Sequence, residues 1–138
     1  MQLMNAAALR KAERALADAD RVMAGLIARH GPCQMQPWAA DPFSALVASI
    51  VSQQLSVKAA DTLLSRVRSL AGRGSRFVPS RLAACEVEQL RACGLSGVKA
   101  RAVRELGEKV VQRRLDLKAL RDMEDAAARG VLLALYRS

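Results

Sequence analysis

Residues 41–60 read DPFSALVASIVSQQLSVKAA, and this stretch is the most informative part of the sequence about the fold. Asp41 is a good N-cap, and Pro42 suits the first helical position because the N–H that it lacks would have no partner there. The apolar residues that follow recur at three- and four-residue steps with small residues between them, which predicts a helix at the centre of the core. The polar run 52–54 breaks the pattern, and Ser56 is a second N-cap. We therefore predict two helices joined by a short polar turn.

Helical patterns continue on both sides of this stretch. Upstream, an apolar stripe over residues 5–29 predicts one long amphipathic helix that Gly31 ends. The scarcity of aromatic and alternating β-branched residues argues against sheet, and we predict an all-α fold of about six to eight helices in a single domain, residues 1–138. Downstream, a helix from Ser56 to about Leu70 is closed by Gly72 and Gly74, two short helices follow between residues 79 and 93, Ser96 and Asp116 cap two more, and the last spans 124–136.

The charge of the chain favours a polyanionic partner. Lys and Arg number 22 against 13 Asp and Glu, which gives a net charge of +9. This is typical of proteins that neutralise phosphates, although a basic surface can also be merely solvated. The three cysteines form no Cys-x-x-Cys pair, and no apolar run is long enough to span a membrane. We predict a cytoplasmic protein without a disulfide, metal site or membrane contact.

Two blocks of sequence carry a resemblance to a known family. The first block is 41–60. In the second block, 93–106, Cys93-Gly94-Leu95-Ser96 is followed by Lys99-Ala100 and then by the apolar residues Val103 and Leu106. Two shorter segments, 115–117 and 132–135, come after these blocks. Over about residues 40–135 the chain resembles the bacterial DNA-3-methyladenine glycosylase II family of the helix-hairpin-helix superfamily. The resemblance implies the first half of that helical bundle and the excision of alkylated purines from double-stranded DNA in base excision repair, with no cofactor.

The resemblance also implies which residues meet DNA. The turn at 52–54 is expected near the gap that the flipped base leaves, whereas the alternative is that these residues only satisfy the carbonyls at the helix end. For the basic residues the alternative is a solvated face. The aromatic residues available as pocket walls are Phe43, Phe77, Trp38 and Tyr136; the predicted DNA and base-pocket residues are Ser52, Gln53, Gln54 and Phe43, and the candidate phosphate contacts are Lys99, Arg101 and Lys58.

The family's hairpin motif and catalytic Asp are not found in this sequence. In the family, a Leu-Pro-Gly-Ile-Gly hairpin follows the segment that matches 132–135, whereas here Tyr136-Arg137-Ser138 follows. Among the thirteen acidic residues, we interpret Asp41 and Asp116 as caps and the others as surface residues, so we assign none as catalytic. Three hypotheses stay open: an enzyme, an inactive DNA-binding remnant, and a helical interaction domain that pairs with another copy. We also expect incomplete packing of part of the 43–51 stripe and of Leu132, Leu133 and Leu135.

Overall fold

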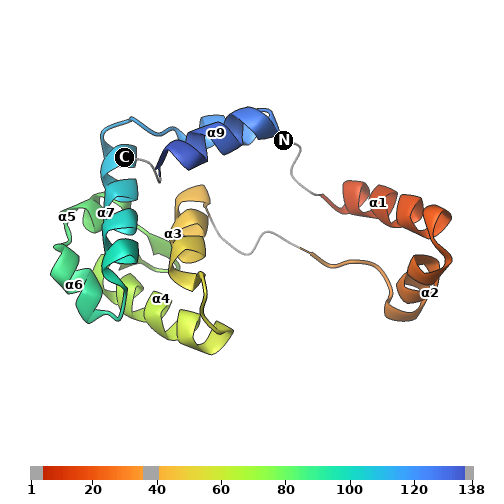
Figure 1. The fold of residues 1–138 in the computed structure, drawn as a ribbon, viewed down its shortest axis with the longest axis horizontal. Helices are drawn as coiled ribbons and strands as arrows, with labels where there is room; N and C mark the ends of the chain where they lie inside the picture. The colour runs from red at the N-terminus through yellow and green to blue at the C-terminus, as the bar shows by residue number, and fades with distance from the viewer. Residues whose placement is uncertain (1–4, 36–40, 136–138) are drawn as a thin grey trace. The chain divides into compact units, whose positions relative to one another are not determined.

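The structure is a computed structural model that describes residues 5–35 and 41–135 (Figure 1). Its contacts divide the chain into two compact units, the N-terminal unit (Gln2–Pro37) and the main unit (Trp38–Ser138). We describe each unit by itself, and the single domain over 1–138 stays a prediction. The described residues are mostly helical and contain only two very short strands, which confirms the all-α prediction.

The N-terminal unit is a helical hairpin rather than one helix. Helix α1 (Ala6–Ala19) and helix α2 (Arg21–His30) are separated by Asp20. The Asp20 backbone is extended, and its carboxylate accepts hydrogen bonds from the amides of Val22 and Met23. These bonds satisfy two N–H groups at the start of α2, so they favour a new helix over continuation of the first. The predicted single helix over 5–29 was wrong at this position, and nine helices are therefore found in the described residues where about six to eight were expected.

In the main unit, the predicted caps begin four of the helices. Asp41 accepts from the amide of Ser44 at 2.8 Å, Ser56 from that of Ala59 at 3.3 Å and Ser96 from that of Lys99 at 3.2 Å, while Asp116 accepts from two amides of its first turn. These contacts confirm the predicted helix starts. The helices of this unit are α3 (Pro42–Ser52), α4 (Val57–Ala71), α5 (Pro79–Ala84), α6 (Val87–Ala92), α7 (Gly97–Val111), α8 (Leu117–Asp122) and α9 (Asp125–Leu135).

A small β-hairpin connects α4 to α5. Its strands are β1 (Gly72–Arg73) and β2 (Arg76–Phe77), which pair antiparallel with Arg73 opposite Arg76. The sequence pattern predicted only a helix end here, because two-residue strands carry no readable alternation of apolar and polar residues. The hairpin turns the chain so that α5 packs along α7.

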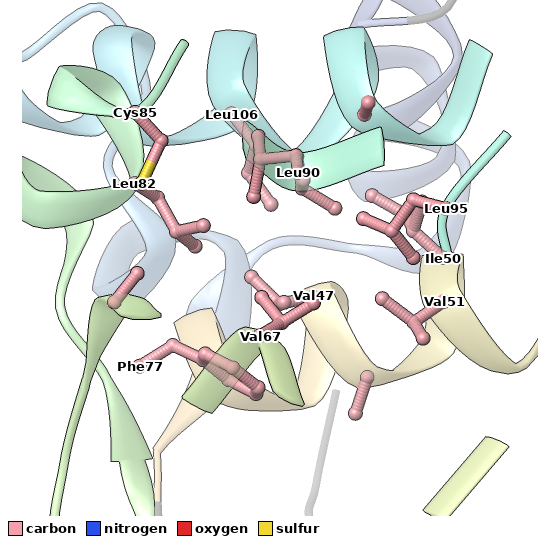
Figure 2. Close-up of a cluster of buried hydrophobic side chains, with 14 of the residues drawn as sticks. Val47, Ile50, Val51, Val67, Phe77, Leu82, Cys85, Leu90, Leu95 and Leu106 are labelled. Carbon is pink, nitrogen blue, oxygen red and sulfur yellow. The ribbon is translucent and has the colours of Figure 1, made fainter. Parts of the chain in front are cut away.

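Helix α3 lies at the centre of the core, as predicted. It contacts α4, α7 and β2, and its apolar stripe is buried: Val47 and Val51 are completely buried, and Phe43 and Ile50 are 5% and 8% exposed. Neighbouring helices cover these four side chains. Leu46, the fifth apolar residue of the predicted stripe, is half-buried, so the expected incomplete packing is limited to this residue. Side chains from five elements and two loops meet on it (Figure 2): Val67 of α4, Phe77 of β2, Leu82 of α5, Leu90 of α6, Leu106 of α7 and the loop residues Cys85 and Leu95.

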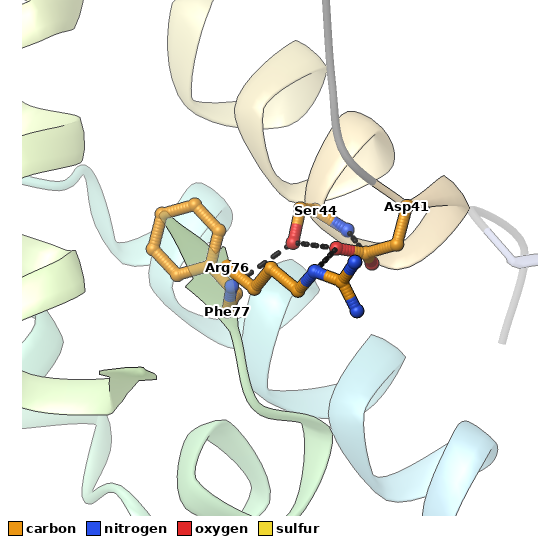
Figure 3. A network of polar contacts seen from close by, with 4 residues as sticks. All are labelled: Asp41, Ser44, Arg76 and Phe77. Carbon is orange, nitrogen blue, oxygen red and sulfur yellow. Dashed lines mark hydrogen bonds and ion pairs between the residues drawn. The ribbon is translucent and has the colours of Figure 1, made fainter. Parts of the chain in front are cut away.

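A buried hydroxyl joins the start of α3 to the β-hairpin. Ser44 is 5% exposed; its Oγ donates to the Asp41 carboxylate at 2.7 Å and accepts from the Phe77 amide at 2.9 Å (Figure 3). Arg76 Nε lies 3.9 Å from the same carboxylate. This network satisfies every polar group that it buries, so it fixes the hairpin on α3 rather than weakening the core.

Candidate nucleic-acid interface

The turn between α3 and α4 presents the predicted polar residues. Helix α3 ends at Ser52, and Gln53 leaves the helical conformation with φ −53° and ψ 129°. Gln54 then adopts a φ of +58°, the left-handed region that non-glycine residues seldom occupy, and the amide of Leu55 donates to the carbonyl of Ser52 at 3.1 Å. Such a conformation costs on the order of 1–3 kcal/mol and persists only where surrounding contacts hold it, as at ligand-binding sites. Both glutamine side chains are exposed.

Lys99 holds this turn from the neighbouring helix. Its Nζ donates to the carbonyl of Val51 at 2.7 Å and to that of Gln53 at 2.6 Å. These carbonyls lie at the C-terminal end of α3, where backbone acceptors lack helical partners and where the helix dipole favours a cation. Lys99 is positioned in turn by its own backbone, because its amide donates to the capping hydroxyl of Ser96. The α3–α4 turn and the N-terminus of α7 are therefore one connected surface, which we call the turn surface: residues 52–56 and 96–101.

The structure brings most of the predicted site residues to this surface. Ser52 is half-buried within it. The Arg101 guanidinium lies beside the start of α7, since a Cβ added to Gly97 would be 3.4 Å from it. Lys58 is exposed in the first turn of α4, just beyond it. Lys99 is there too, but two of its three possible donors are occupied by carbonyls. Phosphate contact by Lys99, Arg101 and Lys58 stays a prediction.

Phe43 is not brought to the turn surface. It lies in the first turn of α3, about 14 Å along the helix from Ser52, and its ring belongs to the core. Phe77 is also buried, with the Arg68 guanidinium 5.3 Å from the centre of its ring. The other two candidate aromatic residues, Trp38 and Tyr136, lie outside the described residues. The base-pocket role of Phe43 stays a prediction.

Exposed apolar side chains accompany the polar ones. Leu55 is 38% exposed, and Val57 and Val98, at the starts of α4 and α7, are 79% and 70% exposed. Large apolar side chains gathered at one end of a domain are typical of a surface that meets a partner. Sequence reasoning missed these residues, because Val57 and Val98 fit the apolar stripes of their helices and Leu55 lies in the turn between two helices.

No acidic side chain in the described ranges occupies a buried site. Ser44 is the one buried polar residue among them. Several acids have structural partners: Asp20, Asp41 and Asp116 cap helices through their side chains, Glu86 is the N-cap residue of α6, and Glu13, Glu88 and Glu108 pair with arginines. A carboxylate tuned for catalysis is ordinarily held in a cleft away from such partners. The absence of a catalytic acid stays a prediction.

Neither a metal-binding cluster nor a membrane-spanning helix is found in the described residues. They contain no group of three or more His, Cys, Asp or Glu side chains that could hold a metal ion. None of their helices is both long and apolar enough to cross a membrane.

Comparison with known proteins shows the family. Residues 47–136 match the family model of the HhH-GPD superfamily base excision DNA repair proteins. DNA-3-methyladenine glycosylase 1 of Schizosaccharomyces pombe is 30% identical over 71 residues, which are 51% of this chain and 31% of that protein.

Two solved structures share the fold. The crystal structure of a DNA-3-methyladenine glycosidase from Bacillus halodurans matches 87% of this chain with a TM-score of 0.72 and 35% identity. The S. pombe 3-methyladenine DNA glycosylase (Mag1), in complex with abasic DNA, matches 80% of it with a TM-score of 0.65 and 25% identity. The chain spans 54% and 59% of the lengths of these two structures. The sequence match and the shared fold show that this chain belongs to the HhH-GPD superfamily of base excision DNA repair proteins.

Proposed function

We propose that the chain acts in the repair of alkylated DNA and that its turn surface contacts the duplex where a base is displaced. The observation that carries this proposal is Gln54, an exposed residue in a left-handed conformation that Lys99 stabilises through the neighbouring carbonyls. The relatives of this chain are 3-methyladenine DNA glycosylases, and the structure of one of them was solved in complex with abasic DNA. A rigid polar turn flanked by apolar side chains suits a surface that enters a disturbed base stack.

The residues of the turn surface divide by the chemistry that they offer. The amides of Gln53 and Gln54 carry both donors and acceptors, so they can pair with base edges that a displaced nucleotide leaves exposed. Arg101 and Lys58 provide exposed positive charge for backbone phosphates on either side. We propose Ser52 as a supporting group, because it lies half-buried at the base of the turn.

We further propose that the 138-residue chain recognises DNA without cleaving the glycosidic bond. A glycosylase stabilises positive charge on the sugar as the base departs, and the family uses a carboxylate for this purpose. The acids described above are mostly committed to helix caps or to surface ion pairs. Recognition therefore fits the chain better than bond cleavage.

Two measurements on one alkylated duplex test both parts of the proposal. Release of 3-methyladenine or 7-methylguanine would be followed under single-turnover conditions beside a full-length relative, and affinity would be measured on the same DNA. We expect salt-sensitive binding with no release above the uncatalysed rate. Release by the 138-residue chain would overturn the non-catalytic part, and absence of binding at low salt would overturn DNA recognition altogether.

Self-association is the second candidate, favoured by exposed apolar residues elsewhere in the chain. Leu133 on α9 is 46% exposed, Leu132 is half-buried, and Leu16, Val22 and Leu26 of the N-terminal unit are 43–71% exposed. Faces of this kind pair with other copies in many small proteins. Light scattering across a hundredfold range of concentration would show a concentration-dependent mass under this hypothesis and a constant monomer mass otherwise.

The cytoplasmic location stays a prediction.

A further inference from the structure

The β-hairpin carries an unusual concentration of positive charge. Between residues 62 and 85 the sequence has five arginines and no acidic residue or lysine. Four of the five are exposed, namely Arg66, Arg73, Arg76 and Arg81. A stretch of one sign on a soluble domain raises the local potential for anions.

The pairing of the strands places two of these charges side by side. Arg73 and Arg76 are direct cross-strand partners. Side chains of such partners project from the same face of the ladder, and like charges in this position destabilise a hairpin. The Asp41 carboxylate lies 3.9 Å from Arg76 Nε (Figure 3). Because this carboxylate already accepts two hydrogen bonds from Ser44, it offsets only part of the positive charge of the arginine pair.

The other arginines hold the hairpin in shape. Arg81 donates to the carbonyl of Gly72 at 2.6 Å, and Arg68 lies over the ring of Phe77. Arg73 has no hydrogen bond or ion pair from its side chain to any residue in 5–35 or 41–135. The arrangement is therefore a firmly mounted hairpin that presents one free and one partly neutralised guanidinium to solvent.

We propose that Arg73 and Arg76 form a second phosphate-binding surface for duplex DNA, separate from the turn surface. Helix α4 has 15 residues and runs from the turn surface at its start to the hairpin at its end, so the two lie about 22 Å apart. That separation exceeds the spacing of adjacent phosphates, so the two surfaces contact different parts of the backbone or different duplexes. Guanidinium groups suit phosphates because they donate in a planar fork.

Nucleic acid fits this surface better than a lipid membrane. A helix or loop that binds a membrane surface adds apolar side chains that enter the lipid. Between residues 62 and 85, Leu70 is the one exposed large apolar residue, at 37%, while Phe77 and Leu82 are buried. Charge without an accompanying apolar face indicates contact with phosphates in water.

The test is the salt dependence of binding to an undamaged duplex, which does not depend on glycosylase activity. Arg73→Gln and the double variant with Arg76→Gln would be compared with Arg14→Gln/Arg21→Gln, which removes the same charge from exposed positions in the N-terminal unit. Each lost phosphate contact should lower the slope of log K against log salt by about 0.9 and weaken binding about eightfold at 0.1 M salt. Arg73→Gln alone keeps the Asp41 contact, so it separates lost binding from a disturbed fold.

The inference and the proposed function fail differently in this experiment. The hairpin surface is supported, even if no base is released, when the salt slope falls by the amount of one phosphate contact for Arg73→Gln and of two for the double variant. The slope of the control variant should stay unchanged. Equal slopes for hairpin and control variants would overturn it while leaving the turn surface untouched. Hairpin-dependent binding to vesicles containing phosphatidylserine, without any effect on DNA, would assign the surface to a membrane and also overturn it.

Discussion

Replacing Lys99 by methionine tests whether this residue holds the turn surface together. Methionine keeps most of the apolar stem but removes the ammonium, so the carbonyls of Val51 and Gln53 lose their donor. A hydrogen bond from a charged donor contributes about 1.5–3 kcal/mol, and partial exposure of this ammonium reduces the sum for the pair to about 1–2 kcal/mol. Gln54 would then be free to leave its left-handed conformation.

The loss of these two hydrogen bonds should lower the stability of the whole unit and also loosen the turn itself. In urea denaturation we expect Lys99→Met to lower the free energy of unfolding by about 1–2 kcal/mol. The Leu55 amide, which donates to Ser52, reports on the turn directly, and its hydrogen exchange should accelerate about 5- to 30-fold. Lys58→Met removes the same charge from an exposed position and should change stability by less than about 0.5 kcal/mol.

The DNA affinity of the same variants separates two roles of Lys99. If its ammonium positions the turn, Lys99→Met weakens binding without changing the salt slope, and Lys99→Arg restores part of the affinity. A direct phosphate contact would instead lower the slope by about 0.9. If Lys99→Met is as stable as Lys58→Met and the exchange of Leu55 is unchanged, Lys99 does not hold the turn.

Three further changes test the packing of the main unit. Ser44→Ala leaves the buried amide of Phe77 without an acceptor, so urea denaturation should show a loss of about 1–3 kcal/mol. Gly107→Ala should cost a similar amount, because its Cβ would lie 2.7 Å from a backbone carbonyl of α5 that cannot easily move; an unchanged melting temperature would show that the two helices separate freely. Burial raises the pKa of the Cys85 thiol, so at pH 8 it should react with a thiol reagent more slowly than the exposed Cys33, as a mass-spectrometric time course would reveal.

Local features of this fold were predictable from sequence. Asp41, Ser56, Ser96 and Asp116 cap their helices through hydrogen bonds to amides two or three residues away, and such contacts depend only on the nearby chain. Asp20 uses the same chemistry but was missed. The apolar stripe continues across it, so periodicity favoured one helix where capping made two.

Contacts between distant residues were not predictable in the same way. Lys99 meets carbonyls 46 and 48 residues earlier in the chain, and Ser44 meets an amide 33 residues later. In the sequence, Lys99 is a basic residue in the first turn of a helix, and for this reason it was predicted to contact phosphate. Nothing in the sequence shows that its ammonium reaches carbonyls of another helix. Nothing in the spacing of Arg73 and Arg76 shows that they become cross-strand partners until the hairpin is seen.

The proposed contact between the turn surface and DNA at a disturbed base pair can be tested by hydrogen exchange of the chain with and without a duplex that carries one abasic site. The exchange would be read by mass spectrometry for peptides that cover 52–56 and 96–101. We expect added protection in both segments, and we expect Gln53→Ala/Gln54→Ala to remove it. Binding of the duplex with unchanged exchange in both segments would show that the turn surface does not contact DNA.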